Sequence, residues 1–204
     1  ESKAKELETA YKNVTAFRAD VSKESELSAF FDFVIDKYGA VDCVVSNAGI
    51  SQISLFTDIT EEQFDGICGV NFKGTFLTLK LAAKHMIRQK RGSIVTVSSM
   101  WGQTGGSCEA VYSATKAAVI GLTKALAKEL GPSGIRVNCV CPGVIDTEMN
   151  SNLTDGDVAT LEEETPLCRI GKPSEVADLI YYLCSEQSSF VTGQIISAGG
   201  GIVI

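Results

Sequence analysis

Apolar residues recur at two spacings along the chain, and these spacings predict strands that alternate with helices. Residues 41–47 and 135–143 are continuous apolar runs, typical of parallel strands covered on both faces. Residues 22–39 carry apolar side chains at helical spacing instead. The same criteria predict strands at 14–20, 92–99 and 193–200, and helices at 60–89, 109–130 and 174–185. The alternation predicts an α/β fold with a doubly wound parallel sheet, and we expect a single domain over residues 1–204.

Short polar residues mark the expected starts of the helices. Thr60 and Gln63 match a capping box, and Ser22 and Ser174 are expected N-caps. Gly39 is expected to end the helix that starts near Ser22. The acidic segment 147–165 has no strand pattern, and we expect it to form a mobile lid.

Composition and charge narrow the class of protein. The net charge of -7 argues against a nucleic-acid partner, and no apolar run approaches the roughly 20 residues of a membrane span. We find no signal-peptide pattern and expect a cytoplasmic protein with reduced thiols, those of Cys43, Cys139 and Cys141 being buried. His85 is the sole histidine, which argues against a His-based metal site or a Ser-His triad, so we expect no metal.

Polar residues and glycines follow several predicted strands. Ligands bind beyond the carboxyl ends of the strands in such sheets. The residues at these ends are Asp20, Val21, Asn47, Ala48, Gly49, Ser99, Pro142 and Gly143. Gly49 lacks a Cβ, so the backbone there can approach a ligand closely. We therefore expect a binding site at this edge of the sheet.

Tyr112 and Lys116 lie one helical turn apart and share a helix face. Such a pair is usually a surface feature when it stands alone. A tyrosine pKa of about 10 is too high for efficient proton transfer near neutrality. A lysine ammonium about 5 Å away, at an effective dielectric constant of about 20, would lower that pKa by about two units. We therefore expect a lowered pKa for Tyr112.

Seven short motifs occur in a fixed order along the whole chain. They are DV at 20–21, NAG at 47–49, VNFKGTF at 70–76, SS at 98–99, YSATK at 112–116, RVNCVCPG at 136–143 and TGQ at 192–194. In sequence and order they resemble the short-chain dehydrogenases/reductases. The resemblance implies a Rossmann-like fold and hydride transfer between a nicotinamide cofactor and a carbonyl group.

The resemblance also implies roles for individual residues. Tyr112 would be the general acid/base, Ser99 would orient the substrate oxygen, and Asn71 would hold a water in a proton relay behind Lys116. The implied cofactor contacts are Asp20 and Val21 at the adenine, Asn47, Ala48 and Gly49 along its ribose, Tyr112 and Lys116 at the nicotinamide ribose, and Pro142, Gly143, Ile145 and Thr147 around the nicotinamide. NADP(H) is favoured as the cofactor, and NAD(H) is possible.

The family's glycine-rich phosphate-binding loop is not found in this sequence. GQTGG at 102–106 is not equivalent to it, because that segment does not follow a first strand. We therefore expect this sequence to lack the first two strands and the phosphate loop of such a fold, and to be part of a longer protein. The residues that choose between NADH and NADPH would lie in the missing part.

Two substrate classes remain open. Residues 166–177 and 188–194 resemble the bacterial 3-oxoacyl-acyl-carrier-protein reductases, which reduce β-keto thioesters with NADPH and are usually homotetramers. The turn at Ser133 lacks the basic residue that would suit an acidic carrier. Trp101 and Cys108 resemble residues of the elongation factor P 5-aminopentanone reductases, and we expect both to line the substrate cleft. The ketone would then be carried by a protein.

The small-residue faces of helices 60–89 and 109–130 suit subunit contacts in a homotetramer or homodimer, or packing against the chain's own sheet. A non-catalytic oligomeric scaffold that binds partners through these helices is the alternative from another class. The complete set of four catalytic-type residues argues against it, because a scaffold does not need them.

Overall fold

The fold is built on one parallel sheet, and a computed structural model describes residues 2–151 and 153–203. Its strands are β1 (Cys43–Ser46), β2 (Gly92–Val97), β3 (Ile135–Pro142) and β4 (Ile195–Ala198), hydrogen-bonded in the order β1-β2-β3-β4. Val44 pairs with Ile94, and Ile94 pairs with Val137. The predicted parallel α/β architecture is therefore confirmed, and the carboxyl ends of all four strands meet at one edge.

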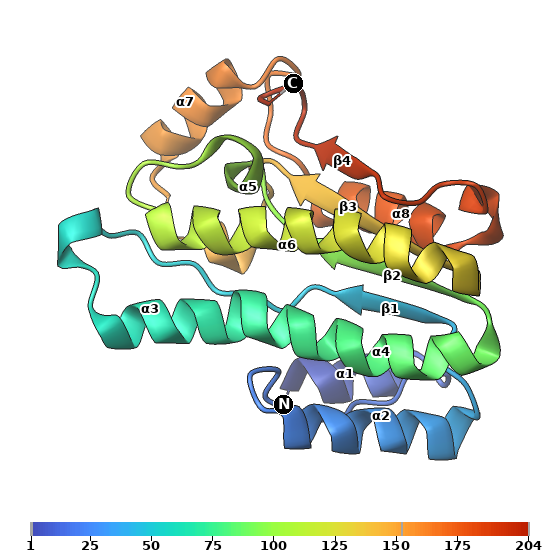
Figure 1. Cartoon of the computed structure of the whole chain (residues 1–204). Helices are drawn as coiled ribbons and strands as arrows, with labels where there is room; N and C mark the ends of the chain where they lie inside the picture. Colours follow the sequence, from blue (N-terminus) through green and yellow to red (C-terminus); the bar gives the residue numbers. More distant parts are fainter. Residues whose placement is uncertain (1, 152, 204) are drawn as a thin grey trace.

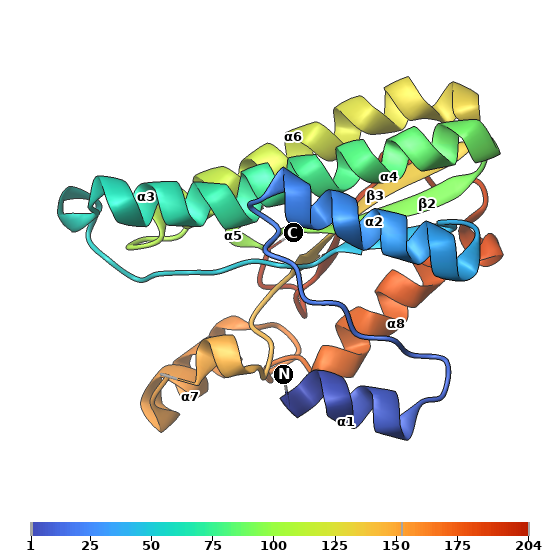
Figure 2. The same cartoon turned by 90° about the horizontal axis from the view of Figure 1, so that it is seen from below.

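Helices cover both faces of this sheet (Figure 1). Seen from below, α2, α4 and α6 lie on one side and α1, α7 and α8 on the other (Figure 2). The helices are α1 (Ser2–Ala10), α2 (Glu24–Tyr38), α3 (Glu61–Cys68), α4 (Thr75–Gln89), α5 (Trp101–Thr104), α6 (Ala110–Leu130), α7 (Asp155–Glu164) and α8 (Pro173–Cys184). A π-helical turn, η2 (Gly69–Gly74), joins α3 to α4. None of the helices in the described ranges is long and apolar enough to span a bilayer.

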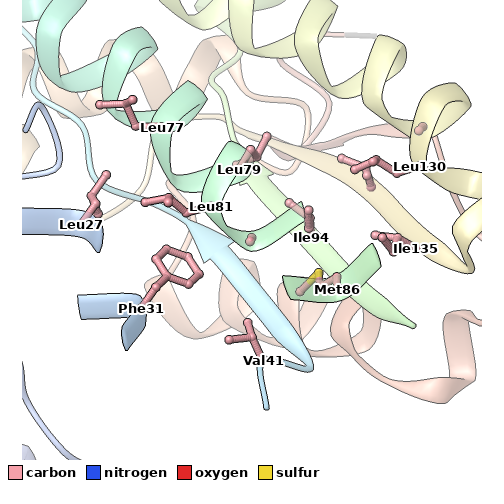
Figure 3. Close-up of a cluster of buried hydrophobic side chains, with 13 residues drawn as sticks. Leu27, Phe31, Val41, Leu77, Leu79, Leu81, Met86, Ile94, Leu130 and Ile135 are labelled. Atoms are coloured by element: carbon pink, nitrogen blue, oxygen red, sulfur yellow. The ribbon is translucent and has the colours of Figure 1, made fainter. Parts of the chain in front are cut away.

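The largest core cluster lies between the sheet and the helices of one face (Figure 3). Leu27 and Phe31 of α2 pack toward Leu79 of α4, and Ile94 and Ile135 contribute the strand side. Each is at most 3% exposed. Burying one such side chain contributes about 1.5–3 kcal/mol, so this cluster fixes α2 and α4 relative to the strands that carry the candidate site.

Two predicted helix ends are confirmed. The Thr60 side chain accepts a hydrogen bond from the Gln63 N–H, and the Gln63 side chain accepts one from the Thr60 N–H. Gly39 ends α2 in the left-handed conformation, with φ of 80°, and its N–H donates to the Ile35 carbonyl. The end of α2 follows from residue type because glycine adopts positive φ without a Cβ clash. The start of α3 follows from the threonine hydroxyl, which accepts a hydrogen bond from a helix N–H that would otherwise have no partner.

Two predicted N-caps are wrong. The N-cap of α2 is Lys23, because the Ser22 hydroxyl donates to the carboxylate of Asp20 and is not aimed at the helix. Ser174 lies inside α8, which begins at Pro173. Proline suits the first helical position, where its missing N–H would have no partner in any case.

The strand expected at 14–20 is also absent, since these residues have no assigned strand. A strand needs a neighbour with which to form a hydrogen-bond ladder, and the only described partner of β1 is β2. A cavity of about 200 Å³ lies between Phe17 and Val45, and the Val45 residue is 41% exposed. Cys43 is exposed as well, so the predictions of a buried Cys43 thiol and of a strand covered on both faces are wrong at β1. At β3 the predictions of buried thiols and of a strand covered on both faces are confirmed, because Cys139 and Cys141 are buried.

The acidic segment 147–165 contains a short 3-10 turn, η4 (Glu148–Asn150), and α7, and no strand is assigned to its described residues. A capping box at Thr154 and Asp157 starts α7. Its proposed movement as a lid stays a prediction.

Candidate active site

The carboxyl ends of β1, β2 and β3 border a cavity of about 630 Å³. Ten of the residues singled out from the sequence line it: Asn47, Ala48, Gly49, Ser99, Tyr112, Lys116, Pro142, Gly143, Ile145 and Thr147. They come from four separate stretches of the chain, so only the folded sheet brings them together.

Tyr112 lies in the first turn of α6 and is 8% exposed. Its pKa is raised above the ordinary value, chiefly because burial disfavours the phenolate, and the charge of Glu109 acts in the same direction. A side-chain hydrogen bond with Ser99 opposes this shift. The expectation of a lowered Tyr112 pKa is therefore wrong for this structure, because burial outweighs the favourable interactions.

Lys116 lies one turn further along α6 and is 5% exposed. Its Nζ donates to the Val97 carbonyl at 2.9 Å and lies 5.6 Å from the ring centroid of Tyr112. No carboxylate within residues 2–151 and 153–203 forms an ion pair with it. Burial lowers the pKa of Lys116 from 10.5 to about 8, so the ammonium is still the main form at neutral pH.

A tight junction between β2 and α6 fixes this lysine. The Ser98 hydroxyl donates to the main-chain carbonyl of Lys116 at 2.8 Å. Gly102 permits the approach, because a Cβ there would lie 2.6 Å from the Ser98 Oγ. The Ser99 Oγ, next in the chain, accepts a hydrogen bond from the N–H of Trp101 at 3.2 Å. The paired serines therefore have separate tasks: Ser98 holds α6, and Ser99 faces the cavity.

Asn71 lies in the π-helical turn η2 and is 1% exposed. Its amide nitrogen donates to the Ile50 carbonyl at 2.9 Å, and its amide oxygen accepts from the Ile50 N–H at 2.8 Å. The amide nitrogen also donates to Thr115 at 3.2 Å. The Asn71 side chain thus holds the loop after β1 against α6, and π-turns are frequent at functional sites. Its part in a water relay stays a prediction.

The cavity fits the nicotinamide half of a dinucleotide. A Cβ at Gly49 would lie 3.2 Å from the Lys116 Nζ, and one at Gly143 would lie 2.6 Å from the Cα of Gly199. Packing within the protein therefore leaves no room for a side chain at Gly143 and little at Gly49, and both glycines line the cavity. Lys116 and Thr147 supply polar groups at the same cavity.

The two residues expected at the adenine lie apart from this cavity. Val21 lines the neighbouring cavity of about 200 Å³, together with Asn47 and Ala48. Asp20 lines neither cavity, and its carboxylate accepts hydrogen bonds from the N–H and hydroxyl of Ser22. These bonds lower the pKa of Asp20. The assignment of both residues to the adenine stays a prediction.

Neither Trp101 nor Cys108 lines the cavity. Gly106 lies against the indole of Trp101, since a Cβ there would be 2.9 Å from the ring. Cys108 has a φ of 59°, and its carbonyl accepts a hydrogen bond from the Ser54 N–H at 2.9 Å. Both residues shape the loop before α6, and their contact with substrate stays a prediction.

Sequence reasoning missed one wall of the cavity. Val176, Ala177 and Ile180 of α8 line it, with Met149 of η4 nearby on the same wall. Their apolar spacing on a predicted helix was the available signal, but it did not distinguish contact with the sheet from contact with a ligand. A hydrogen bond between Ser51 and Glu109, beside Tyr112, was also missed.

Comparison with known proteins agrees with this geometry. A family model described as enoyl-(acyl carrier protein) reductase matches residues 1–203, and the chain belongs to the short-chain dehydrogenase/reductase family of oxidoreductases. It is 42% identical over 204 residues to the 3-oxoacyl-acyl-carrier-protein reductase FabG of Thermotoga maritima, covering 100% of this chain and 83% of that protein.

Two further relatives are of similar closeness. The uncharacterized oxidoreductase YmfI of Bacillus subtilis is 38% identical over 189 residues, covering 93% of this chain and 77% of that protein. The FabG of Chlamydia muridarum is 39% identical over 183 residues, covering 90% of this chain and 74% of that protein.

Proposed function

We propose that this protein is an NAD(P)(H)-dependent carbonyl reductase in which Tyr112 is the general acid. The observation that supports this most directly is the convergence of Ser99, Tyr112 and the buried Lys116 at one cavity, with the Lys116 Nζ 5.6 Å from the ring centroid of Tyr112. The reduced nicotinamide would supply the hydride. Its ribose would lie near Lys116, and its ring would lie between Gly143, Ile145 and Thr147.

The side chains would divide the proton chemistry among them. Ser99 would hold the substrate oxygen by a hydrogen bond, and the Tyr112 hydroxyl would donate its proton to that oxygen as negative charge develops. The raised pKa of Tyr112 keeps the phenol protonated at neutral pH, as an acid requires. The Lys116 ammonium would stabilise the phenolate left behind, and Asn71 would connect this site to water.

Replacing Tyr112 with phenylalanine tests the proposal. NADPH oxidation with an acetoacetyl thioester should fall by about 10²–10⁴-fold, while the thermal midpoint and assembly state stay near those of the wild type. Tyr181, which is 76% exposed, provides the matched control: Tyr181→Phe should keep full activity. Turnover retained in Tyr112→Phe would contradict the role of this residue. Turnover absent from the wild type with every ketone tested would favour a non-catalytic scaffold.

We propose a 3-oxoacyl-acyl-carrier-protein reductase-like activity, with NADP(H) as the favoured cofactor and NAD(H) as the alternative. The two FabG relatives support it, since both are named as reductases of that substrate class. An elongation factor P 5-aminopentanone reductase is the second candidate, based on Trp101 and Cys108 alone. Comparing kcat/KM for an acetoacetyl thioester and for an amino ketone distinguishes them.

We also propose a cytoplasmic homotetramer, with a homodimer as the alternative. Small residues on the outer face of α6, Ala114, Ala117 and Gly121, are exposed, and so are Phe72 and Phe76 nearby on η2 and α4. Close packing of two copies needs such small residues. Light scattering of Ala117→Arg against the wild type tests this: a loss of mass per particle is expected.

A further inference from the structure

Two cysteines meet at the end of the sheet opposite the candidate active site. Cys43 begins β1, and Cys184 ends α8, 141 residues later in the chain. The Cys43 thiol donates a hydrogen bond to the main-chain carbonyl of Cys184 at 3.3 Å, so the two residues are in direct contact. Both residues line a cavity of about 720 Å³. Figure 1 shows the start of β1 and the end of α8 at the same end of the molecule.

The surroundings favour a reactive thiolate at Cys43. The neighbouring side chain of Cys184 has the largest effect on the pKa of Cys43 and lowers it, and the nearby Arg136 guanidinium acts in the same direction. Arg136 is held there because it donates to main-chain carbonyls on both sides of Cys184. Asp42 and Glu186 oppose the shift, as burial does. The pKa of Cys43 is therefore lowered, which favours its reactive thiolate form.

The remaining cysteines lack this combination of access and activation. Cys139 and Cys141 are at most 1% exposed, so an oxidant does not reach them in the folded state. Burial raises the pKa of the Cys68 thiol. Oxidation is therefore expected to be selective for the pair that faces the cavity.

We propose that Cys43 and Cys184 form a redox-active dithiol site that peroxides oxidise to a disulfide between β1 and α8. The Cys43 thiolate attacks one oxygen of hydrogen peroxide, the O–O bond breaks, and the leaving hydroxide takes up the proton that the thiol had released, so a sulfenic acid and one water result. The Cys184 sulfur then attacks the sulfenic sulfur, its proton leaves with the displaced hydroxyl as a second water, and the S–S bond forms. One peroxide is reduced to two waters, and two thiols are oxidised. A small-molecule dithiol reverses the reaction.

Peptide mapping after treatment with hydrogen peroxide tests the site. The intact protein should lose two hydrogens, and trypsin should release peptide 38–73 covalently joined to peptide 170–204. Because Cys68 also lies in the first peptide, Cys68→Ser is the matched control and must still form the link. Cys43→Ser and Cys184→Ser must each abolish it. Sulfinic or sulfonic acid on Cys43 without a link, or a link that survives Cys43→Ser, would overturn the proposal.

Alkylation of the protein by iodoacetamide gives a second readout that needs no oxidant. At pH 7 the Cys43 thiol should react about tenfold faster than the exposed Cys168. Cys184→Ala should remove this advantage, whereas Cys184→Ser, which keeps a hydroxyl donor, should retain part of it. Equal rates at Cys43 and Cys168 in the wild type would refute the activation of Cys43.

Discussion

Replacing Lys116 with methionine should stabilise the fold at pH 7 even though it removes a proposed catalytic group. The Lys116 residue is 5% exposed, so its ammonium has lost most of its hydration. A fall in its pKa from 10.5 to about 8 corresponds to a penalty of about 3 kcal/mol at pH 7, at 1.36 kcal/mol per unit. The methionine loses the hydrogen bond to the Val97 carbonyl, which costs about 1–2 kcal/mol. We expect a net gain in the free energy of unfolding of about 1–2 kcal/mol.

The pH dependence of this difference is the sharper part of the prediction. Below pH 8 Lys116 is protonated in both the folded and the unfolded protein, and the penalty is present in full. Between pH 8 and pH 10.5 the unfolded chain binds the proton more tightly, so the free energy of unfolding of the wild type rises with pH. Lys116→Met lacks this rise. Its advantage over the wild type should therefore shrink by about 3 kcal/mol between pH 7 and pH 10.5.

Urea unfolding of both proteins from pH 7 to pH 10.5 measures the effect, and taking their difference cancels the titration of groups that do not interact with Lys116. Lys124→Met, an exposed lysine of the same helix, is the control and should show a difference near zero at every pH. A Lys116→Met difference that stays constant over this range would refute the desolvation of the ammonium. NADPH oxidation should be lost in Lys116→Met and kept in Lys124→Met.

Three further substitutions test the packing that supports the site. Leu79→Ala should lower the free energy of unfolding by about 2–5 kcal/mol because Leu79 is 1% exposed, whereas Leu55→Ala, at a 61% exposed position, should change it by less than about 0.5 kcal/mol; equal urea midpoints would contradict this core. Gly143→Ala should lower the thermal midpoint, because its Cβ would lie 2.6 Å from the Cα of Gly199. It should also weaken NADPH binding in a fluorescence titration. Unchanged affinity would exclude close approach of the cofactor to Gly143. Thr60→Ala should cost about 1 kcal/mol in urea unfolding, and no loss would mean that its capping bond is negligible.

The elements predicted best from the sequence are the strands buried on both faces and the helix ends formed by neighbouring residues. β2 and β3 are buried on both faces, so continuous apolar runs identified them almost to the residue. Capping residues located the start of α3 and the end of α2 because those bonds form within a few residues. Local chemistry of this kind is readable from a short window of sequence.

The failures share a dependence on partners distant in the chain. Residues 14–20 have strand composition, but composition does not provide a neighbouring ladder. The pKa of Tyr112 was expected to fall because of the nearby lysine, yet burial by the whole fold raises it. The π-helical turn at Asn71 could not be predicted either, since a hydrophobic pattern over 60–89 does not distinguish a helix from a helix with one widened turn.

Locally unfavourable features are concentrated at the carboxyl edge of the sheet. A buried ammonium without an ion-pair partner among the described residues, a π-helical turn and a cysteine at positive φ occur there at Lys116, Asn71 and Cys108. Each costs stability that a core of apolar residues and regular helix would not. At the opposite end of the sheet, the partly buried guanidinium of Arg136 has carbonyl and hydroxyl acceptors, and Lys90 has a φ of 54°. A buried ammonium beside a π-helical turn is expected where an edge of a fold is retained for chemistry, so these features support a catalytic site at the carboxyl edge independently of sequence similarity.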